Sequence, residues 1–373
     1  MHFEASRRTF LRGSLLAGLA LPLAACGQGG SAGGQKIGSN LEEIISLAKK
    51  EQKVQLIAYP ETWANYRGHF KEFTARYGVE TPVQSPDISS AEELQAVKTL
   101  RGQESQPDVL DIGYSFTQPA EKQNLIEPYK PTTFDAIPTA LKDPEGMWVG
   151  AYFGALSIGI DANEVDRPES FEDLLKDEYR GKVALPGNPR KGASSVAAVF
   201  AAALANGGSL DDISPGIEFF AHLAEVGNLV SIPGVAAGLS TGQASVVFDW
   251  NYNFLGAKEE IERNGVALEY WVPQDGIYGN YYAQPVTVNS PNPNAARLWV
   301  EWLNSDEGAE QYALGGAVPA RFAELSKAGR LSEKALSNLP DPQVIEKIEF
   351  PTIEQGEAAN QLIAAQWAQK VRI

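Results

Sequence analysis

Aromatic and acidic side chains gather where predicted strands end, and together they could hold an organic cation. Asp249 follows a predicted strand over 244–248, and Asp111 lies near the end of another over 108–113. A cation is attracted to the faces of tryptophan and tyrosine rings, and a carboxylate adds a charge-assisted hydrogen bond. The residues that we expect to contact such a ligand are Tyr59, Trp63, Tyr114, Ser115, Tyr152, Ser194, Ser195, Asp249, Trp250, Tyr252, Tyr278, Tyr281 and Tyr282. Loop tyrosines of this kind could instead cap the edge of a core with the hydroxyl in water.

A second stretch favours the opposite chemistry. Arg190 and Lys191 stand just before Ser194 and Ser195, which begin a predicted helix over 194–205. Free backbone N–H groups at a helix N-terminus, with two hydroxyls and two cations, suit an anion such as phosphate. The stretch could equally be a serine N-cap beside solvated surface cations. A zwitterion could use both features, so the charge of the ligand stays open.

The sequence has no hydrolase pattern in the setting that catalysis requires. G-x-S-x-G occurs at 29–33, within the glycine-rich stretch, and at 238–242, before a predicted strand and not between a strand and a helix. H-E-x-x-H is absent, and the one cysteine, Cys26, lies near the N-terminus. His69 and His222 fall inside helical patterns, so neither is placed as a general base. We therefore predict no catalytic residues, no metal and no cofactor. A secreted hydrolase is the alternative from a different functional class.

Strands and helices alternate along the chain, which predicts mostly parallel sheets covered by helices on both faces. Ligands of such sheets lie beyond the carboxyl ends of the strands. The predicted strands cover 54–59, 81–84, 108–113, 152–160, 182–185, 244–248, 267–272 and 281–289. The predicted helices cover 41–50, 62–77, 91–101, 194–205, 217–226 and 293–303, with another opening at 171–175. The pattern starts again at 152–160, which indicates two similar halves.

The first 38 residues have the features of an export and anchoring segment. Residues 6–11 (SRRTFL) precede an apolar run over 15–25 that is too short to span a bilayer, and they resemble a twin-arginine signal. Residues 23–26 (LAAC) resemble a lipobox, which makes Cys26 the lipidation site. Residues 27–38 are rich in glycine and predict a flexible tether. We expect an extracytoplasmic protein, in the periplasm or at the cell surface, that touches the membrane only through this lipid anchor.

The length of the chain indicates how many domains it forms, and its net charge excludes some classes of binding partner. The 335 residues or so that follow the tether are enough for two domains with real cores. The net charge of −16 argues against nucleic acid and anionic lipid, because both require a basic face. We expect a monomer that binds a small-molecule solute.

Several motifs resemble the type II periplasmic binding proteins of ABC importers. They are PGNP at 186–189, STGQA at 240–244, FDWN at 248–251, VPQDG at 272–276 and GGAVPAR at 315–321. The resemblance implies an α/β fold of two lobes, 39–150 with 283–373 and 151–282, joined by crossing strands near 149–157 and 277–286. It also implies hinge closure over a solute and delivery to an ABC permease with its ATPase. The chain itself has no phosphate-binding loop of an ATPase.

The family resemblance leaves the ligand open. Its members bind polyamines, thiamine, ferric ion, aminophosphonates and sugar phosphates. Polyamine binders carry an acid where this chain has Tyr281 or Tyr282, and iron binders add a histidine and a carboxylate to such a tyrosine pair. We expect an organic cation or zwitterion that resembles thiamine or a polyamine. The alternatives are a phosphonate or other phosphorylated molecule, and ferric ion.

Overall fold

The computed structural model describes residues 36–232 and 235–372. The predicted twin-arginine signal, Cys26 and residues 27–35 of the predicted tether lie outside the described residues. Among the helices of the described part, none has the length and hydropathy to cross a membrane.

The predicted strands and helices appear in the predicted order, with further elements between and after them. The strands are β1 (Leu56–Ile57), β2 (Val83–Gln84), β3 (Ile112–Gly113), β4 (Ile126–Glu127), β5 (Tyr152–Asp161), β6 (Val183–Ala184), β7 (Leu229–Val230), β8 (Val246–Trp250), β9 (Leu268–Trp271), β10 (Gly279–Ala283), β11 (Val286–Thr287) and β12 (Val318–Pro319). The α-helices are α1 (Leu41–Glu51), α2 (Tyr66–Tyr77), α3 (Ser90–Leu100), α4 (Thr117–Lys122), α5 (Ala193–Ala205), α6 (Ser214–Glu225), α7 (Val235–Ser240), α8 (Asn251–Arg263), α9 (Pro293–Leu303), α10 (Asp306–Leu314), α11 (Phe322–Lys327), α12 (Glu333–Asn338), α13 (Pro342–Ile345) and α14 (Ile353–Lys370). Short 3-10 helices are η1 (Trp63–Asn65), η2 (Tyr114–Phe116), η3 (Phe134–Ala136), η4 (Thr139–Leu141), η5 (Glu172–Leu175) and η6 (Asp177–Tyr179).

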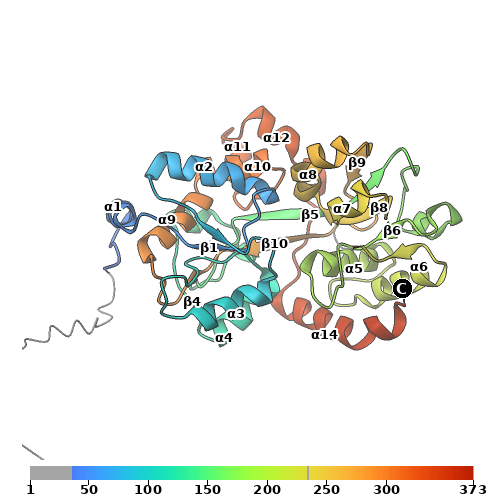
Figure 1. The fold of residues 1–373 in the computed structure, drawn as a ribbon, viewed down its shortest axis with the longest axis horizontal. Helices are drawn as coiled ribbons and strands as arrows, with labels where there is room; N and C mark the ends of the chain where they lie inside the picture. Colours follow the sequence, from blue (N-terminus) through green and yellow to red (C-terminus); the bar gives the residue numbers. More distant parts are fainter. Residues whose placement is uncertain (1–35, 233–234, 373) are drawn as a thin grey trace, which may run out of the picture. The chain divides into compact units, whose positions relative to one another are not determined.

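The long strand β5 connects two regions of the structure (Figure 1). Its first half pairs with β10 and β12, and its second half pairs with β8 and β9, all antiparallel. Two of its residues are glycines for a steric reason, because a Cβ on Gly154 would lie 2.5 Å from the ring of Tyr252 and one on Gly159 would lie 2.3 Å from the ring of Phe254. The aromatic residues at the start of α8 therefore pack directly on the backbone of β5.

One mixed sheet contains most of the strands. Its order is β3-β10-β5-β8-β6-β7, and β12 and β9 also pair with β5. The strands β6, β7 and β8 run parallel to one another, as the sequence predicts, whereas β10 pairs antiparallel with both β3 and β5. Two further two-stranded sheets are β1 with β2, parallel, and β4 with β11, antiparallel. The carboxyl ends of β1, β3 and β8 each lead directly into a loop or helix, and this places the side chains described below.

Several predicted strands are shorter than expected, and two of them have a clear local reason. The strand predicted over 54–59 is reduced to β1, and Ala58 after it has a φ of 58°, a left-handed conformation that cannot continue a strand. The strand predicted over 281–289 divides into β10 and β11. Pro285 lies between them and has no backbone N–H to donate to a neighbouring strand. The helix predicted over 62–77 is likewise divided into η1 and α2, where Asn65 has a φ of 59°.

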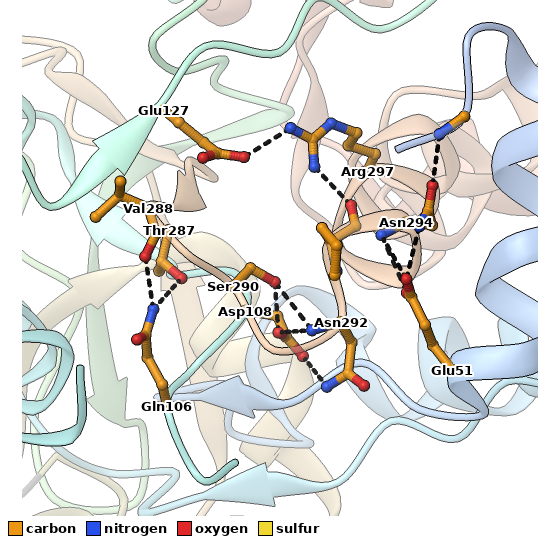
Figure 2. Close-up of polar contacts among 12 residues, drawn as sticks. Glu51, Gln106, Asp108, Glu127, Thr287, Val288, Ser290, Asn292, Asn294 and Arg297 are labelled. Carbon is orange, nitrogen blue, oxygen red and sulfur yellow. Dashed lines mark hydrogen bonds and ion pairs between the residues drawn. The ribbon is translucent and has the colours of Figure 1, made fainter. Parts of the chain in front are cut away.

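A network of buried polar groups fixes the return of the chain after β11 (Figure 2). The carboxylate of Asp108 accepts hydrogen bonds from the Ser290 hydroxyl at 2.6 Å, from the backbone and side-chain amides of Asn292 at 2.9 Å each, and from the Gln55 backbone at 2.6 Å. Beside it, the half-buried Glu127 pairs with the buried guanidinium of Arg297 at 2.6 Å. The contacts of Asp108 with Ser290 and Asn292, and that of Glu127 with Arg297, join residues 170 to 184 positions apart, so they fix the chain after β11 against the early strands.

The last long helix, α14, contacts elements from both regions joined by β5. Trp367 near its end packs on Phe220 of α6 with the ring centroids 5.7 Å apart, and Lys370 pairs with Glu218. Near its start, Gly356 lies against the hydroxyl of Tyr114 in η2. The lobe boundaries predicted from the sequence place α14 in the first lobe and remain a prediction.

Candidate functional site

A cavity of about 590 Å³ opens where the loops after β1, β3, β6 and β8 converge. One wall comes from residues 58–116 and the opposite wall from residues 186–261, with Tyr282 of β10 between them. We call it the central cavity. Its polar and aromatic lining residues are Thr62, Trp63, Asp87, Ser89, Ser90, Glu93, Asp111, Phe116, Lys191, Ser194, Ser195, Asp249, Asn253, Phe254, Glu260 and Tyr282.

Glu93 belongs to the first wall and is buried, at 1% exposure. The start of α3 explains its position: Ser89 and Glu92 form a capping box, with Glu92 accepting from the Ser89 backbone at 2.8 Å, so Glu92 stays at the surface. The next residue points inward on the same face as Val97. The Glu93 carboxylate accepts a hydrogen bond of 3.0 Å from the backbone N–H of Asp111. Burial raises its pKa well above the usual range.

Asp111, at the end of the loop before β3, is a second buried carboxyl in the same wall. It accepts hydrogen bonds from the hydroxyls of Tyr66 at 2.8 Å and Tyr152 at 3.2 Å, and from the side-chain amide of Gln284 at 2.6 Å. Burial raises the pKa of Asp111 to about 7, although these three hydrogen bonds act to lower it. Two carboxyl groups thus adjoin each other with no basic side chain in this wall of the cavity.

The opposite wall presents Asp249 and the N-terminus of α5. Asp249 is the second-last residue of β8 and is 9% exposed; its Oδ1 accepts from the backbone N–H of Trp250 at 2.8 Å and from Asn253 Nδ2 at 3.0 Å. Burial raises the pKa of Asp249 to about 6, against the lowering effect of these hydrogen bonds and of one from Ser194. Lys191 is the one basic side chain that lines the central cavity in the described part of the chain.

Aromatic rings complete the cavity. Trp63 in η1 is half-buried and lies edge-on to Tyr282, with ring centroids 5.9 Å apart. Phe116 of η2 and Phe254 of α8 also line the wall. The central cavity therefore combines three buried carboxyl groups with aromatic surface, which is the chemistry that suits an organic cation.

The structure brings five of the predicted contact residues to the central cavity: Trp63, Ser194, Ser195, Asp249 and Tyr282. The others lie near it without lining it. Trp250 and Tyr252 are 1% exposed and stack on each other, Tyr59 donates to the Leu110 carbonyl oxygen, and Tyr152 donates to Asp111. Tyr278, Tyr281 and Tyr114 form a buried aromatic group, and Ser115 is half-buried in η2.

Sequence reasoning did not select Glu93, Phe116 or Phe254. A signal for Glu93 was present, since an acid four residues before Val97 falls on the apolar face of a predicted helix. Phe254 follows Asp249 by five positions in α8 and reaches the cavity only because Gly159 lets its ring lie on β5. No local pattern marks Phe116.

Neither of the two histidines considered in the sequence analysis, His69 and His222, lines the cavity. His69 is fully buried in α2, accepts a hydrogen bond from Trp302 Nε1 at 3.2 Å, and has its pKa lowered to about 3 by burial. His222 is exposed on α6. Within residues 36–232 and 235–372, no group of three or more His, Cys, Asp or Glu side chains is placed to hold a metal ion.

The chain matches the pattern of a known protein family over most of its length. The pattern of the family described as bacterial extracellular solute-binding protein matches residues 104–347. An uncharacterized protein of Haemophilus influenzae is 24% identical over 255 residues, which are 64% of this chain and 69% of that protein.

Solved structures of periplasmic binding proteins share the fold. The protein AfuA of Actinobacillus pleuropneumoniae, solved with fructose-6-phosphate, has a TM-score of 0.67 at 17% identity, covering 86% of this chain and 99% of that one. The spermidine/putrescine ABC transporter protein PotD of Streptococcus pneumoniae has a TM-score of 0.61 at 15% identity, covering 86% and 100%. These similarities confirm the two-lobe α/β fold expected from the sequence.

Proposed function

The chain belongs to the family of bacterial extracellular solute-binding proteins, and we propose that it captures a small organic cation or zwitterion in the central cavity. Proteins of this family bind solutes outside the cytoplasm and work with ABC permeases. The open question is therefore which solute this cavity accepts.

The set of carboxyl groups that line the cavity is the observation that carries the proposal. Glu93, Asp111 and Asp249 are buried carboxyl groups that line one cavity, and Lys191 is the one basic residue among its described lining residues. A carboxylate that loses water on burial is stabilised by a cation that replaces the water. A ligand with an ammonium or similar group would supply that charge, and Trp63 and Tyr282 would contact its cationic face.

Carboxyl groups in both walls also bear on whether the cavity could hold a diamine. Tyr281 and Tyr282 stand where polyamine binders carry an acid, which weakens a diamine reading if only the sequence is considered. In the structure, Glu93 and Asp111 lie in the wall opposite Asp249. A ligand with two cationic or hydrogen-bond-donating ends would meet a carboxyl group at each end.

We infer that closure bends the chain at β5 and the end of β10. Tyr152 of β5 and Gln284 after β10 both donate to Asp111 in the cavity wall. A ligand that contacts both walls favours the closed form by its differential contacts, as hinge closure requires.

Membrane attachment through Cys26 is a separate part of the proposal. It rests on the lipobox-like residues 23–26 and on the glycine-rich stretch that follows. Labelling with a palmitate analogue in cells should depend on Cys26. A Cys26→Ser variant that still incorporates the label would disprove the anchor and leave solute binding untouched.

A thermal-shift screen tests the ligand class. We expect thiamine, spermidine or 2-aminoethylphosphonate to raise the melting temperature of the purified protein, because a ligand that binds only the folded state stabilises it. A hexose phosphate, which has no cationic group, serves as the contrast. A shift with the hexose phosphate alone would overturn the cation proposal and favour the phosphorylated alternative.

A further inference from the structure

The N-terminus of α5 opens onto the central cavity with its hydrogen-bond donors unused. Gly192 is the N-cap residue and supplies no side-chain cap, and the first amide to donate back to the preceding turn is that of Val196, to the Gly192 carbonyl oxygen at 3.2 Å. Among the described residues, no acceptor is found for the backbone N–H groups of Ala193, Ser194 and Ser195. Such groups carry partial positive charge that favours an anion.

Ser195 gives an independent indication of a ligand. It is fully buried and lines the central cavity, yet its hydroxyl has no hydrogen-bond partner in the part of the chain that the structure describes. The nearest atom to a Cβ built on Gly187 is Ser195 Oγ, at 3.7 Å, and one built on Gly192 would lie 3.8 Å from it. Two glycines therefore leave space around an unpaired buried hydroxyl. Leaving such a group unpaired is unfavourable, so a partner that arrives with the ligand would stabilise it.

An anion bound at the start of α5 would be repelled by the carboxylate of Asp249. Asp249 and Ser194 both line the central cavity, and the Ser194 side chain acts to lower the pKa of Asp249, so the carboxylate lies close to the same helix start. Two negative groups this close repel each other, unless a positive group lies between them. Arg190 is exposed and donates to Asn188, and Lys191 lines the cavity but is exposed, so water screens its charge. A positive group of the ligand itself, placed between the two negative groups, would remove their repulsion.

We propose that the solute is a zwitterion, with its anionic group bound by the first backbone N–H groups of α5 and by Ser195 Oγ, and its ammonium group placed between that anion and Asp249. The inference rests on the proposed function and makes it more specific. The wall formed by residues 186–261 then binds both charged groups of the ligand. Glu93, Asp111, Trp63 and Tyr282 then face the remainder of the molecule.

Three small probes test the arrangement by their charges. 2-Aminoethylphosphonate carries both charges, ethanolamine carries only the cation and inorganic phosphate only the anion. We expect the zwitterion to bind at least tenfold more tightly than either single-charge probe and to shift the amide resonances of Ala193, Ser194 and Ser195. Ethanolamine binding as tightly as the zwitterion, or a bound zwitterion that leaves these amides unshifted, would overturn the inference.

The same titrations separate this inference from the proposed function. If spermidine or thiamine binds and 2-aminoethylphosphonate does not, the cation-binding function stands and the zwitterion arrangement is wrong. If phosphate alone binds and shifts the three amides, the helix start is an anion site, and both the zwitterion arrangement and the cation proposal are wrong.

A pair of serine variants isolates the hydroxyl. Ser195→Ala should weaken 2-aminoethylphosphonate binding about tenfold, leave ethanolamine binding unchanged, and leave the melting temperature of the free protein undiminished because no internal hydrogen bond is lost. Ser240→Ala is the matched control, since the Ser240 hydroxyl in α7 is also buried and has no partner among the described residues, but lies outside the central cavity. Unchanged affinity of Ser195→Ala for the zwitterion would contradict the role of Ser195.

Discussion

The side-chain amide of Gln284 donates a hydrogen bond of 2.6 Å to Asp111, and its carbonyl oxygen accepts one of 2.8 Å from the backbone of Ala151. Gln284 follows β10 and Ala151 precedes β5, so a single side chain joins both crossing strands to a carboxyl group in the cavity wall. The charge of Asp111 is thereby connected to the segments that we expect to bend.

The pH dependence of stability should reveal Asp111. Burial raises its pKa to about 7, whereas an aspartate in an unfolded chain titrates near pH 3.9, so the folded state holds the proton more tightly. The free energy of unfolding should therefore fall as pH rises between these values, by up to about 4 kcal/mol from this group. Asp111→Asn should remove this pH-dependent contribution. Relative to the natural protein, the variant should therefore have a higher free energy of unfolding in urea at pH 8 than at pH 5.

The exposed Glu349 provides the control for this measurement, with Glu349→Gln measured at the same two pH values. A difference between Asp111→Asn and the natural protein that is equal at pH 5 and pH 8 would show that Asp111 titrates normally.

Adjacent glutamates in α3 offer a test of the first wall. Glu93→Gln removes a buried carboxyl group that faces the cavity, and we expect affinity for a cationic ligand to fall at least tenfold. Glu92→Gln changes the neighbouring exposed carboxylate and keeps the capping box, which glutamine also forms, so affinity should not change. Calorimetric titration of both variants decides the matter; equal losses would mean that the net charge of the protein, rather than Glu93, attracts the ligand.

Two tryptophans should separate binding from folding. Trp63 is half-buried at the cavity. Trp63→Ala should lower the affinity for a cationic ligand by about 3- to 30-fold, because the cation–π contact is lost. Trp250 is buried behind Asp249, and Trp250→Ala should lower the free energy of unfolding by about 3–5 kcal/mol. Denaturant melts together with ligand titrations distinguish the two effects. A Trp250→Ala protein of unchanged stability would contradict the packing described here.

Gly216 should be intolerant of a methyl group. A Cβ at this position of α6 would lie 2.1 Å from the Val199 carbonyl oxygen of α5. Alanine gains about 1 kcal/mol over glycine inside a helix, but overpacking costs about 1–3 kcal/mol and a backbone atom cannot move aside cheaply. We expect Gly216→Ala to be less stable on urea unfolding and to bind ligand more weakly, because α5 is displaced.

Gly113→Ala is the comparison for this helix variant, because its Cβ would meet its nearest neighbour at an ordinary 3.7 Å. Equal stability of the two variants would show that α5 and α6 can move apart freely.

The alternation of strands and helices could be predicted from local periodicity and turn residues, whereas the two-lobe fold was implied by the resemblance to the binding-protein family. The predicted helix over 293–303 coincides with α9, and the predicted strand over 152–160 differs from β5 by one residue. Strand lengths were less predictable. Ala58 has a left-handed backbone conformation, which glycine or asparagine would have indicated but alanine does not. The conformation follows from the packing of the loop and not from the local sequence.

The cavity residues were harder to select, because neighbours on a strand point to opposite faces. Asp249 lines the cavity and Trp250 beside it does not; Tyr282 lines it, whereas Tyr281 stacks on Trp148 with ring centroids 5.8 Å apart. Choosing one residue of each pair requires knowing which face is covered. That depends on elements distant in sequence, such as α14 and α8.

The packing of α5 against α6 has a consequence for selectivity. Nearly every residue from Ser195 to Ala203 is buried, and the approach permitted by Gly216 leaves the helix no room to shift. Donors on so rigid a support need no ordering when the solute arrives, which reduces the entropy lost on binding. The same rigidity prevents the donors from spreading to fit a larger group. We therefore expect the protein to discriminate a planar carboxylate from a tetrahedral phosphonate by shape, even though both carry negative charge.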